Sequence, residues 1–237
     1  YKIMVCISEN SREKELQYID LLYSHRVLGI VVCSHIGETM EHLDSNCPLI
    51  SFEREIAENI PAVLCDNYQG GILAADRLID AGCRNIAIFN QPTKENIPAY
   101  SREKAFLKCC EDKKISGRVV YTDRLAPLSE EFGNNILELL KKNSDLDGIF
   151  ATSDVMAANI IRACKKMGKR VPEDISIVGF DDTWISTLTY PSITTIHQPV
   201  QEMCEYAIEA IVKKVKSEKV PSQVVFPVEL IDRESTK

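Results

Sequence analysis

The stretch DGIFATSDVMAANII, residues 147–161, decides the fold of this chain. Its apolar run Gly148–Thr152 shows no alternation, as expected for a strand that is covered on both faces. Ser153 and Asp154 follow at once and supply a side-chain cap and a negative charge where a helix begins. Apolar residues then recur at helical spacing. The stretch therefore predicts a buried strand that leads directly into a helix.

A second stretch, DISIVGFDD at 174–182, repeats the first half of this pattern. Ile175–Phe180 is again a short apolar run, and it ends in two carboxylates, Asp181 and Asp182. From spacing alone, this pair is typical of a cap at a helix N-terminus. Parallel strands end at the same edge of a sheet, and open α/β sheets bind ligands at that edge. The two stretches thus predict a group of acids at a candidate binding edge.

Strand and helix patterns alternate along the rest of the chain, which predicts parallel sheets with right-handed crossovers. The expected strands include Lys2–Ile7 at the start and Val224–Ile231 at the end. No Gly/Ser linker marks a boundary, so two lobes would be joined by several short crossings. The first expected strand resembles the second strand, not the first, in a series of strand-helix units. We therefore expect one further strand-helix unit, about 30 residues, to lie upstream.

Composition excludes several classes of protein. The chain has 237 residues and a net charge of −7, which argues against this piece binding nucleic acid by itself. No apolar run approaches the ~20 residues that span a bilayer, so we expect no membrane association. The nine cysteines form no CxxC pair, which favours reduced thiols in a cytoplasm. The four histidines have no metal-ligand spacing, so neither metal nor cofactor is expected.

An enzyme is not expected either. The sequence has no GxSxG, P-loop or GxGxxG motif. Asp154 and Asp181 resemble a glycosidase carboxylate pair, but no feature of the sequence would raise the pKa of one of them.

Eight segments, in order along nearly the whole chain, make it resemble the sensor domain of the LacI/GalR family of bacterial transcription regulators. These segments are LLYSHRVLGIVV (21–32), PLISFER (48–54), IPAVLCDNYQGG (60–71), LIDAGCRNIAIF (78–89), SREKAF (101–106), DGIFATSDVMAANII (147–161), GKRVPEDISIVGFDDTWI (168–185) and PSITTIHQPV (191–200).

The resemblance implies a periplasmic binding protein-like I fold, in the α/β class. It has two three-layer α/β/α lobes with parallel sheets, three interlobe crossings and an effector between the lobes. The first lobe would be residues 1–65 with 198–221, and the second 66–197 with 222–237. Members of the family carry an N-terminal helix-turn-helix head, which is absent from this sequence.

The resemblance also implies effector-binding residues. Arg102 stands where the family has an arginine that binds effector hydroxyls or carbonyls, and Asp181 where it has an acid that takes two hydroxyls. This assignment leaves the capping role for Asp182. A carboxylate that accepts from adjacent hydroxyls, opposed by a planar guanidinium donor, is suited to fix the orientation of a sugar.

Other positions match the family pattern less closely. Ser153 stands where many relatives have Asn, Glu53 where Asp is usual, and Leu128 where an aromatic ring often stacks on a sugar. Trp184 or Tyr190 would be the replacement for that ring. The remaining implied contacts are Gln198 at a crossing, and Cys33 and Ser34 at the end of a strand.

The leading hypothesis is the cytoplasmic sensor of a LacI-type regulator, a repressor of sugar-utilisation genes. It would bind a sugar or sugar phosphate and alter operator binding as a homodimer, through the absent head. The alternative is an extracytoplasmic sugar-binding protein that delivers solute to a transporter. The two share a fold, and the cysteine content favours the regulator.

Overall fold

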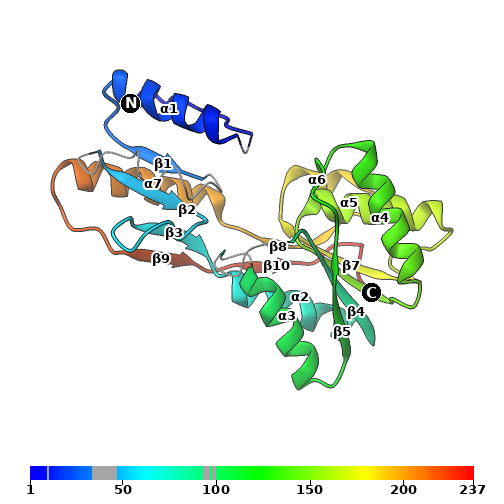
Figure 1. Cartoon of the computed structure of the whole chain (residues 1–237). Coiled ribbons are helices and arrows are strands. Elements are labelled where there is room, and N and C mark those ends of the chain that lie inside the picture. Colours follow the sequence, from blue (N-terminus) through cyan, green and yellow to red (C-terminus); the bar gives the residue numbers. More distant parts are fainter. Residues whose placement is uncertain (10, 34–46, 93–96, 98–99) are drawn as a thin grey trace. The chain divides into compact units, whose positions relative to one another are not determined.

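The computed structural model describes residues 1–9, 11–33, 47–92, 97 and 100–237 (Figure 1). The chain forms two compact units. The first comprises Tyr1–Cys65 and Val200–Phe226, and the second Asp66–Pro199 and Pro227–Lys237. The chain therefore passes from one unit to the other three times.

The first unit contains a parallel sheet with the strand order β1-β2-β3-β9. Helix α7 packs against β1, β2 and β3 through an apolar face that includes Met203 and Ile211. Close packing there requires Gly29, because a Cβ on it would lie 2.6 Å from Cγ2 of Ile211. The elements of this unit are α1 (Arg12–Ser24), β1 (Ile30–Val32), β2 (Leu49–Phe52), β3 (Ala62–Cys65), α7 (Val200–Val215) and β9 (Gln223–Phe226).

The beginning of the chain differs from the prediction. Residues 2–7 form no strand, and most of them are exposed. Among the described residues, β1 pairs only with β2, so this segment has no neighbouring strand to bond. Helix α1 is capped by Ser11, whose Oγ accepts from the backbone N–H of Lys14 at 3.4 Å. The sequence also predicts a weaker helical stretch near 39–43, which lies outside the described residues.

The second unit has a larger sheet with the order β10-β8-β7-β6-β4-β5. Helices α2 and α3 cover one face of it, and α4 and α5 cover the other (Figure 1). Its strands are β4 (Asn85–Asn90), β5 (Ser116–Tyr121), β6 (Gly148–Ala151), β7 (Ser176–Asp181), β8 (Thr194–His197) and β10 (Glu229–Ile231). Its helices are α2 (Asn67–Asp80), α3 (Tyr100–Asp112), α4 (Glu130–Lys142), α5 (Asp154–Lys166) and α6 (Trp184–Leu188).

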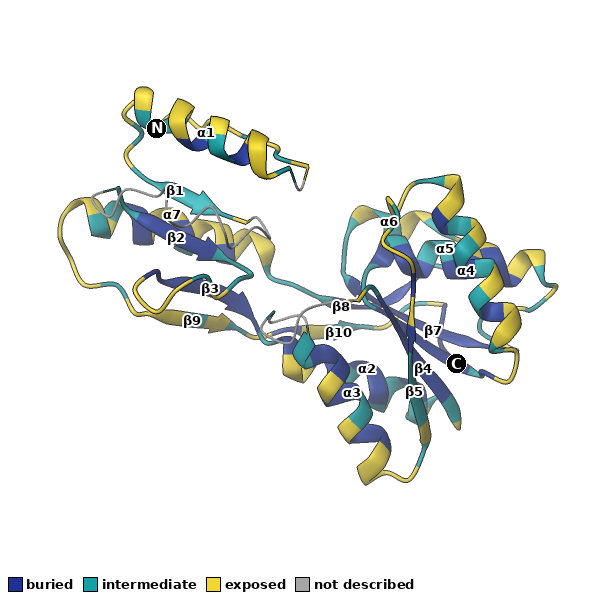
Figure 2. Cartoon of the chain, in the orientation of Figure 1, coloured by how far each residue is buried: buried dark blue, intermediate teal, exposed yellow. Residues whose placement is uncertain are grey.

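The central strands β4, β6 and β7 are buried on both faces, which explains their apolar runs without alternation (Figure 2). On one face they pack against α4 and α5 through residues such as Phe132, Ile136 and Ile160. Elsewhere Phe150 contacts Phe106 of α3 and Phe180 of β7, with ring centroids 5.9 and 6.3 Å apart. This unit is thus the three-layer α/β/α arrangement that the family resemblance implies.

The end of the chain corrects two expectations. The single strand predicted at 224–231 is two strands, β9 in the first unit and β10 in the second. Pro227 lies between them, and proline cannot donate to a strand ladder. Residues 223–226, expected in the second lobe, therefore pair with β3 of the first unit. β10 runs antiparallel to β8, so the larger sheet is not entirely parallel.

In the described part of the chain, no helix has both the length and the apolar character needed to cross a membrane.

Candidate functional site

Arg102 is held in a fixed orientation in the first turn of α3, with only 7% of its surface exposed. Its Nε donates to Oδ1 of Asn67 at 2.5 Å, and its Nη1 donates to the carbonyl oxygen of Thr152 at 3.2 Å. The guanidinium carbon lies 3.4 Å from the centroid of the Phe180 ring, a cation–π contact. Gly70 makes room for this ring, because a Cβ there would lie 2.7 Å from its Cε2 atom.

These contacts bring three predicted residues to one edge of the sheet, namely Arg102, Ser153 and Asp181. Thr152 immediately precedes Ser153, and Phe180 immediately precedes Asp181. β6 and β7 are adjacent and parallel, so both end at this edge. A guanidinium has five N–H donors, and the two bonds described use only two of them. The other three N–H donors of Arg102 therefore lie outside these two bonds.

Asp181 has an unusual backbone conformation. Its φ is +102°, a region that residues with a side chain rarely adopt. It ends β7 and stands in register with His197 of β8. Strained backbone of this kind is commonly found at binding sites, where the surrounding structure maintains it. This observation supports the prediction that Asp181 has a functional role.

Ser153 caps α5, as the sequence predicts: its Oγ accepts from the backbone N–H of Met156 at 3.2 Å. Asp154 is fully buried and links the segment after β7 to β8. It accepts from the backbone N–H and the hydroxyl of Thr183 at 2.6 and 3.1 Å, and from the hydroxyl of Thr195 at 2.7 Å. Burial raises the pKa of this carboxyl, while those hydrogen bonds oppose the rise. Its described contacts are structural.

Asp182 does not cap the following helix, contrary to the prediction. Thr183 is the residue before α6, and its side chain makes no capping bond. Asp182 instead accepts from Nη2 of Arg233 at 2.6 Å and pairs with Nδ1 of His197 at 3.0 Å. Burial by itself would raise the pKa of Asp182, but Arg233 and His197 outweigh it and lower the pKa. Arg233 is 51 positions away in sequence, so local spacing could not reveal this pair.

A further acid at this edge was not predicted. Glu103 is 5% exposed and accepts from Nδ2 of Asn90 at 3.1 Å and from the hydroxyl of Tyr121 at 2.8 Å. Its carboxylate raises the pKa of Tyr121 to about 12. Asn90 also accepts from the hydroxyl of Thr152 at 3.3 Å, so this cluster is continuous with the Arg102 contacts. The only sequence signal was its position next to Arg102.

The other predicted residues have varied surroundings. Gln198 follows β8 and is half-buried, whereas Trp184 is 71% exposed at the start of α6. In the first unit, Cys33 follows β1 and is exposed, and Ser34 lies outside the described residues. Glu53 follows β2 with a φ of +54°, and its carboxylate accepts from the backbone N–H of Cys65 at 2.5 Å. This bond joins the ends of β2 and β3.

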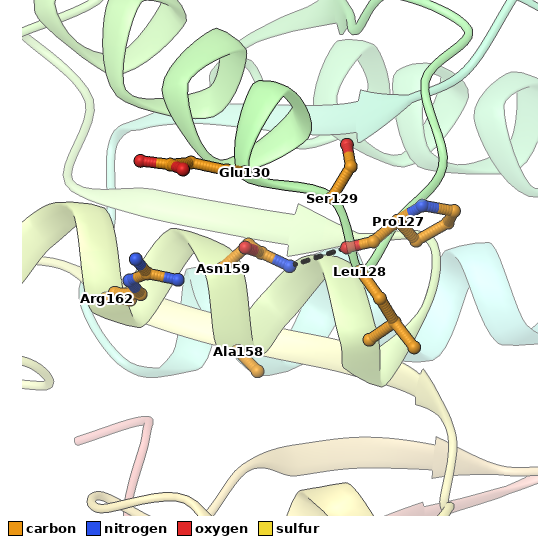
Figure 3. A pocket seen from close by; sticks show the side chains of 7 residues that line it. All are labelled: Pro127, Leu128, Ser129, Glu130, Ala158, Asn159 and Arg162. Atoms are coloured by element: carbon orange, nitrogen blue, oxygen red, sulfur yellow. Dashed lines mark hydrogen bonds between the residues drawn. The ribbon is translucent and has the colours of Figure 1, made fainter.

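Leu128 lies in a groove of the second unit, and 86% of its surface is exposed. The groove has a volume of about 540 Å³ and runs between the start of α4 and the middle of α5 (Figure 3). A hydrogen bond of 3.1 Å from Nδ2 of Asn159 to the carbonyl oxygen of Pro127 crosses it. We call it the α4–α5 groove; it is lined by Pro127, Leu128, Ser129, Glu130, Ala158, Asn159 and Arg162.

No metal-binding cluster of three or more His, Cys, Asp or Glu side chains occurs among the residues that the structure describes. The edge around Arg102 and Asp181 is instead a set of hydrogen-bonding groups, suited to bind a polar organic molecule.

The chain is similar to proteins of known class. The family described as "Periplasmic binding protein-like domain" matches residues 75–236. The ribose operon repressor of Halalkalibacterium halodurans is 31% identical over 238 residues, which cover 100% of this chain and 71% of that protein. That relative is a transcriptional repressor, not an enzyme or a transport protein.

Solved structures agree with this relationship. A periplasmic binding protein/LacI transcriptional regulator from Alkaliphilus metalliredigens QYMF, complexed with D-xylulofuranose, has a TM-score of 0.87 and 33% identity. The match covers 100% of this chain and 88% of that chain. The transcriptional regulator CelR in complex with cellobiose has a TM-score of 0.84 and 26% identity, covering 95% of this chain and 71% of that one. This chain therefore belongs to the LacI family of transcription regulators and is their periplasmic binding protein-like, effector-binding domain.

Proposed function

We propose that this domain binds a small sugar or sugar phosphate through Arg102 and Asp181. The fixed position of Arg102, in contact with Asn67 and with Phe180, the residue immediately before Asp181, carries this proposal. Sugar hydroxyls donate to a carboxylate and accept from a guanidinium. Each such charged hydrogen bond contributes about 1.5–3 kcal/mol, so a few of them are enough for micromolar binding, about 8 kcal/mol.

The relatives support a sugar as the effector. One is named a ribose operon repressor, and two of the similar structures hold D-xylulofuranose and cellobiose. Ser153 and Gln198 would add polar contacts from the second unit. Trp184 would supply an apolar surface, in place of the ring that relatives often have at the position of Leu128. Cys33, Ser34 and Glu53 of the first unit remain predicted contacts.

We further propose that the regulator acts on operator DNA as a homodimer in the cytoplasm, through a separate DNA-binding head. The effector changes operator affinity only by the difference in its own affinity for two states of the protein. The α4–α5 groove supports a dimer, because exposed Leu128 lies there together with the opposite charges of Glu130 and Arg162. A two-fold symmetric interface must be complementary to itself, and a surface with both charges meets that condition.

The test is calorimetric titration of the protein with D-ribose, D-xylulose, cellobiose and phosphorylated sugars. We expect one of these to bind saturably, and Asp181→Asn to abolish that binding while thermal unfolding stays cooperative. Glu173→Gln is the control, since it makes the same chemical change at an exposed site of the same unit. If Asp181→Asn binds the sugar as tightly as Glu173→Gln does, the proposed role of Asp181 is wrong.

A further inference from the structure

Two of the nine cysteines differ from the rest in being exposed. They are Cys33, which follows β1, and Cys204, in the second turn of α7; the other seven are buried or half-buried. All nine lie in the described part of the chain. Both exposed cysteines belong to the first unit, although 171 positions separate them in sequence. They are therefore the thiols that solution reagents reach first.

The packing of α7 on β1 brings these two cysteines to the same end of the sheet. Contact between Gly29, just before β1, and Ile211 of α7 fixes how the helix and the strand lie along each other. From there the strand advances four residues to Cys33, about 13 Å. Cys204 lies seven residues before Ile211, which is about 10 Å back along α7 and on the same helical face. The helix runs antiparallel to the strand, so both steps lead in the same direction (Figure 1).

The electrostatics of Cys33 agree with this placement. Partial loss of hydration around its sulfur raises the pKa of Cys33, and the neighbouring Cys204 thiol raises it further. Since the thiolate is the form that attacks, a protonated Cys33 starts exchange slowly. The raised pKa also means that the reduced form gains no stability from a thiolate. The disulfide is therefore favoured once it has formed.

We propose that Cys33 and Cys204 form a dithiol site that is reversibly oxidised to an intramolecular disulfide by a low-molecular-weight disulfide. One cysteine thiolate attacks the reagent, forms a mixed disulfide and releases the first small thiol. The second cysteine then attacks the mixed disulfide at the protein sulfur and releases the second small thiol. Two protein thiols are oxidised, and one reagent disulfide is reduced to two thiols. The product joins the end of β1 to α7 at the carboxyl edge of the smaller sheet.

The site has a consequence for regulation that rests on the proposed function. Cys33 is also a predicted effector contact, and its sulfur would no longer be available in the disulfide. Oxidation is therefore expected to weaken sugar binding, whereas formation of the disulfide itself does not depend on a sugar.

The experiment counts thiols after treatment of the folded protein with oxidised glutathione, followed by alkylation and peptide mapping. Nine thiols should fall to seven, with Cys33 linked to Cys204 in the peptide map. Cys33→Ser and Cys204→Ser should each lose the intramolecular disulfide, and these exposed sites tolerate serine without loss of the fold. Cys6→Ser is the matched control, and its eight thiols should fall to six.

Three outcomes overturn the proposal: nine thiols retained in the parent, a disulfide between other cysteines, or the same loss of two thiols in Cys33→Ser. Sugar binding by the reduced and oxidised proteins is measured separately. If the reduced protein binds no sugar but the Cys33–Cys204 disulfide forms, the proposed function fails while the dithiol site stands. Equal sugar affinity in both forms would overturn only the regulatory consequence.

Discussion

Arg102 stacks on Phe180: the guanidinium carbon lies 3.4 Å from the ring centroid, and the next residue along the chain is Asp181. The ring and the bond to Asn67 fix the plane of the guanidinium without any ligand. A donor that is already ordered loses little conformational freedom when it binds, and this preserves affinity.

Replacement of this arginine tests the role of its geometry. We expect Arg102→Lys to weaken sugar binding at least tenfold, about 1.4 kcal/mol, because an ammonium cannot make planar, paired contacts. Calorimetric titration measures the effect. Arg162→Lys is the control, as it alters an exposed arginine of the same unit. Unchanged affinity in Arg102→Lys would show that the guanidinium does not contact the sugar.

Removal of Asp154 tests a structural role. Asp154→Ala leaves two hydroxyl donors and one backbone N–H without their acceptor, in a site that is fully buried. We expect a loss of about 3 kcal/mol in the free energy of unfolding, since each unsatisfied buried group costs about 1–3 kcal/mol. Urea denaturation at neutral pH measures this loss.

Asp145→Ala serves as the control for that experiment. Asp145 pairs with Arg118, but 59% of its side chain is exposed, and such pairs contribute less than about 1 kcal/mol. If the two variants lose the same stability, the bonds to Asp154 do not stabilise the link between β8 and the segment after β7.

Much of the second unit could be predicted because its signals are local. The cap by Ser153 follows from residues at the start of one helix, and the structure confirms it. The same holds for the acids at the ends of β6 and β7, whose strands are adjacent and parallel.

What could not be predicted depends on long-range contacts. Gly179 illustrates this, because a Cβ on it would lie 2.5 Å from Oδ1 of Asp154, 25 positions earlier. Likewise, the apolar run at 224–231 carries no sign that it belongs to two sheets, apart from Pro227. The predicted strand at 2–7 had the right residue types, but a strand forms only where a neighbouring strand accepts its hydrogen bonds.

The ion pair of Asp182 predicts a dependence of stability on pH. Its pKa is lowered in the folded protein, so its contribution is fully present above the unfolded value of 3.8 and is lost as pH falls through the folded pKa. Relative to Asp182→Asn, the parent should be more stable by about 2 kcal/mol at pH 7, the range for a charged hydrogen bond. The difference should shrink below about pH 4.

Urea denaturation of both proteins between pH 3 and pH 7 measures this difference. Arg233→Lys is a useful companion variant, since it keeps the charge but removes the planar donor that lies 2.6 Å from Asp182. It should retain part of the pH dependence. A stability difference between parent and Asp182→Asn that is the same at every pH would contradict the assigned ion pair.

The α4–α5 groove predicts how the proposed dimer responds to charge. If Glu130 of one protomer faces Arg162 of the other, Glu130→Arg or Arg162→Glu alone places like charges opposite each other at two symmetric positions. Either variant should weaken the dimer, and the double variant should restore it, because the exchange regenerates opposite charges. Leu128→Glu should weaken it as well, since it puts a charge into the apolar part of the contact. Sedimentation equilibrium gives the dimer dissociation constant, with Lys142→Glu at the far end of α4 as the control. Dimers of equal strength in all of these variants would show that the groove lies outside the interface.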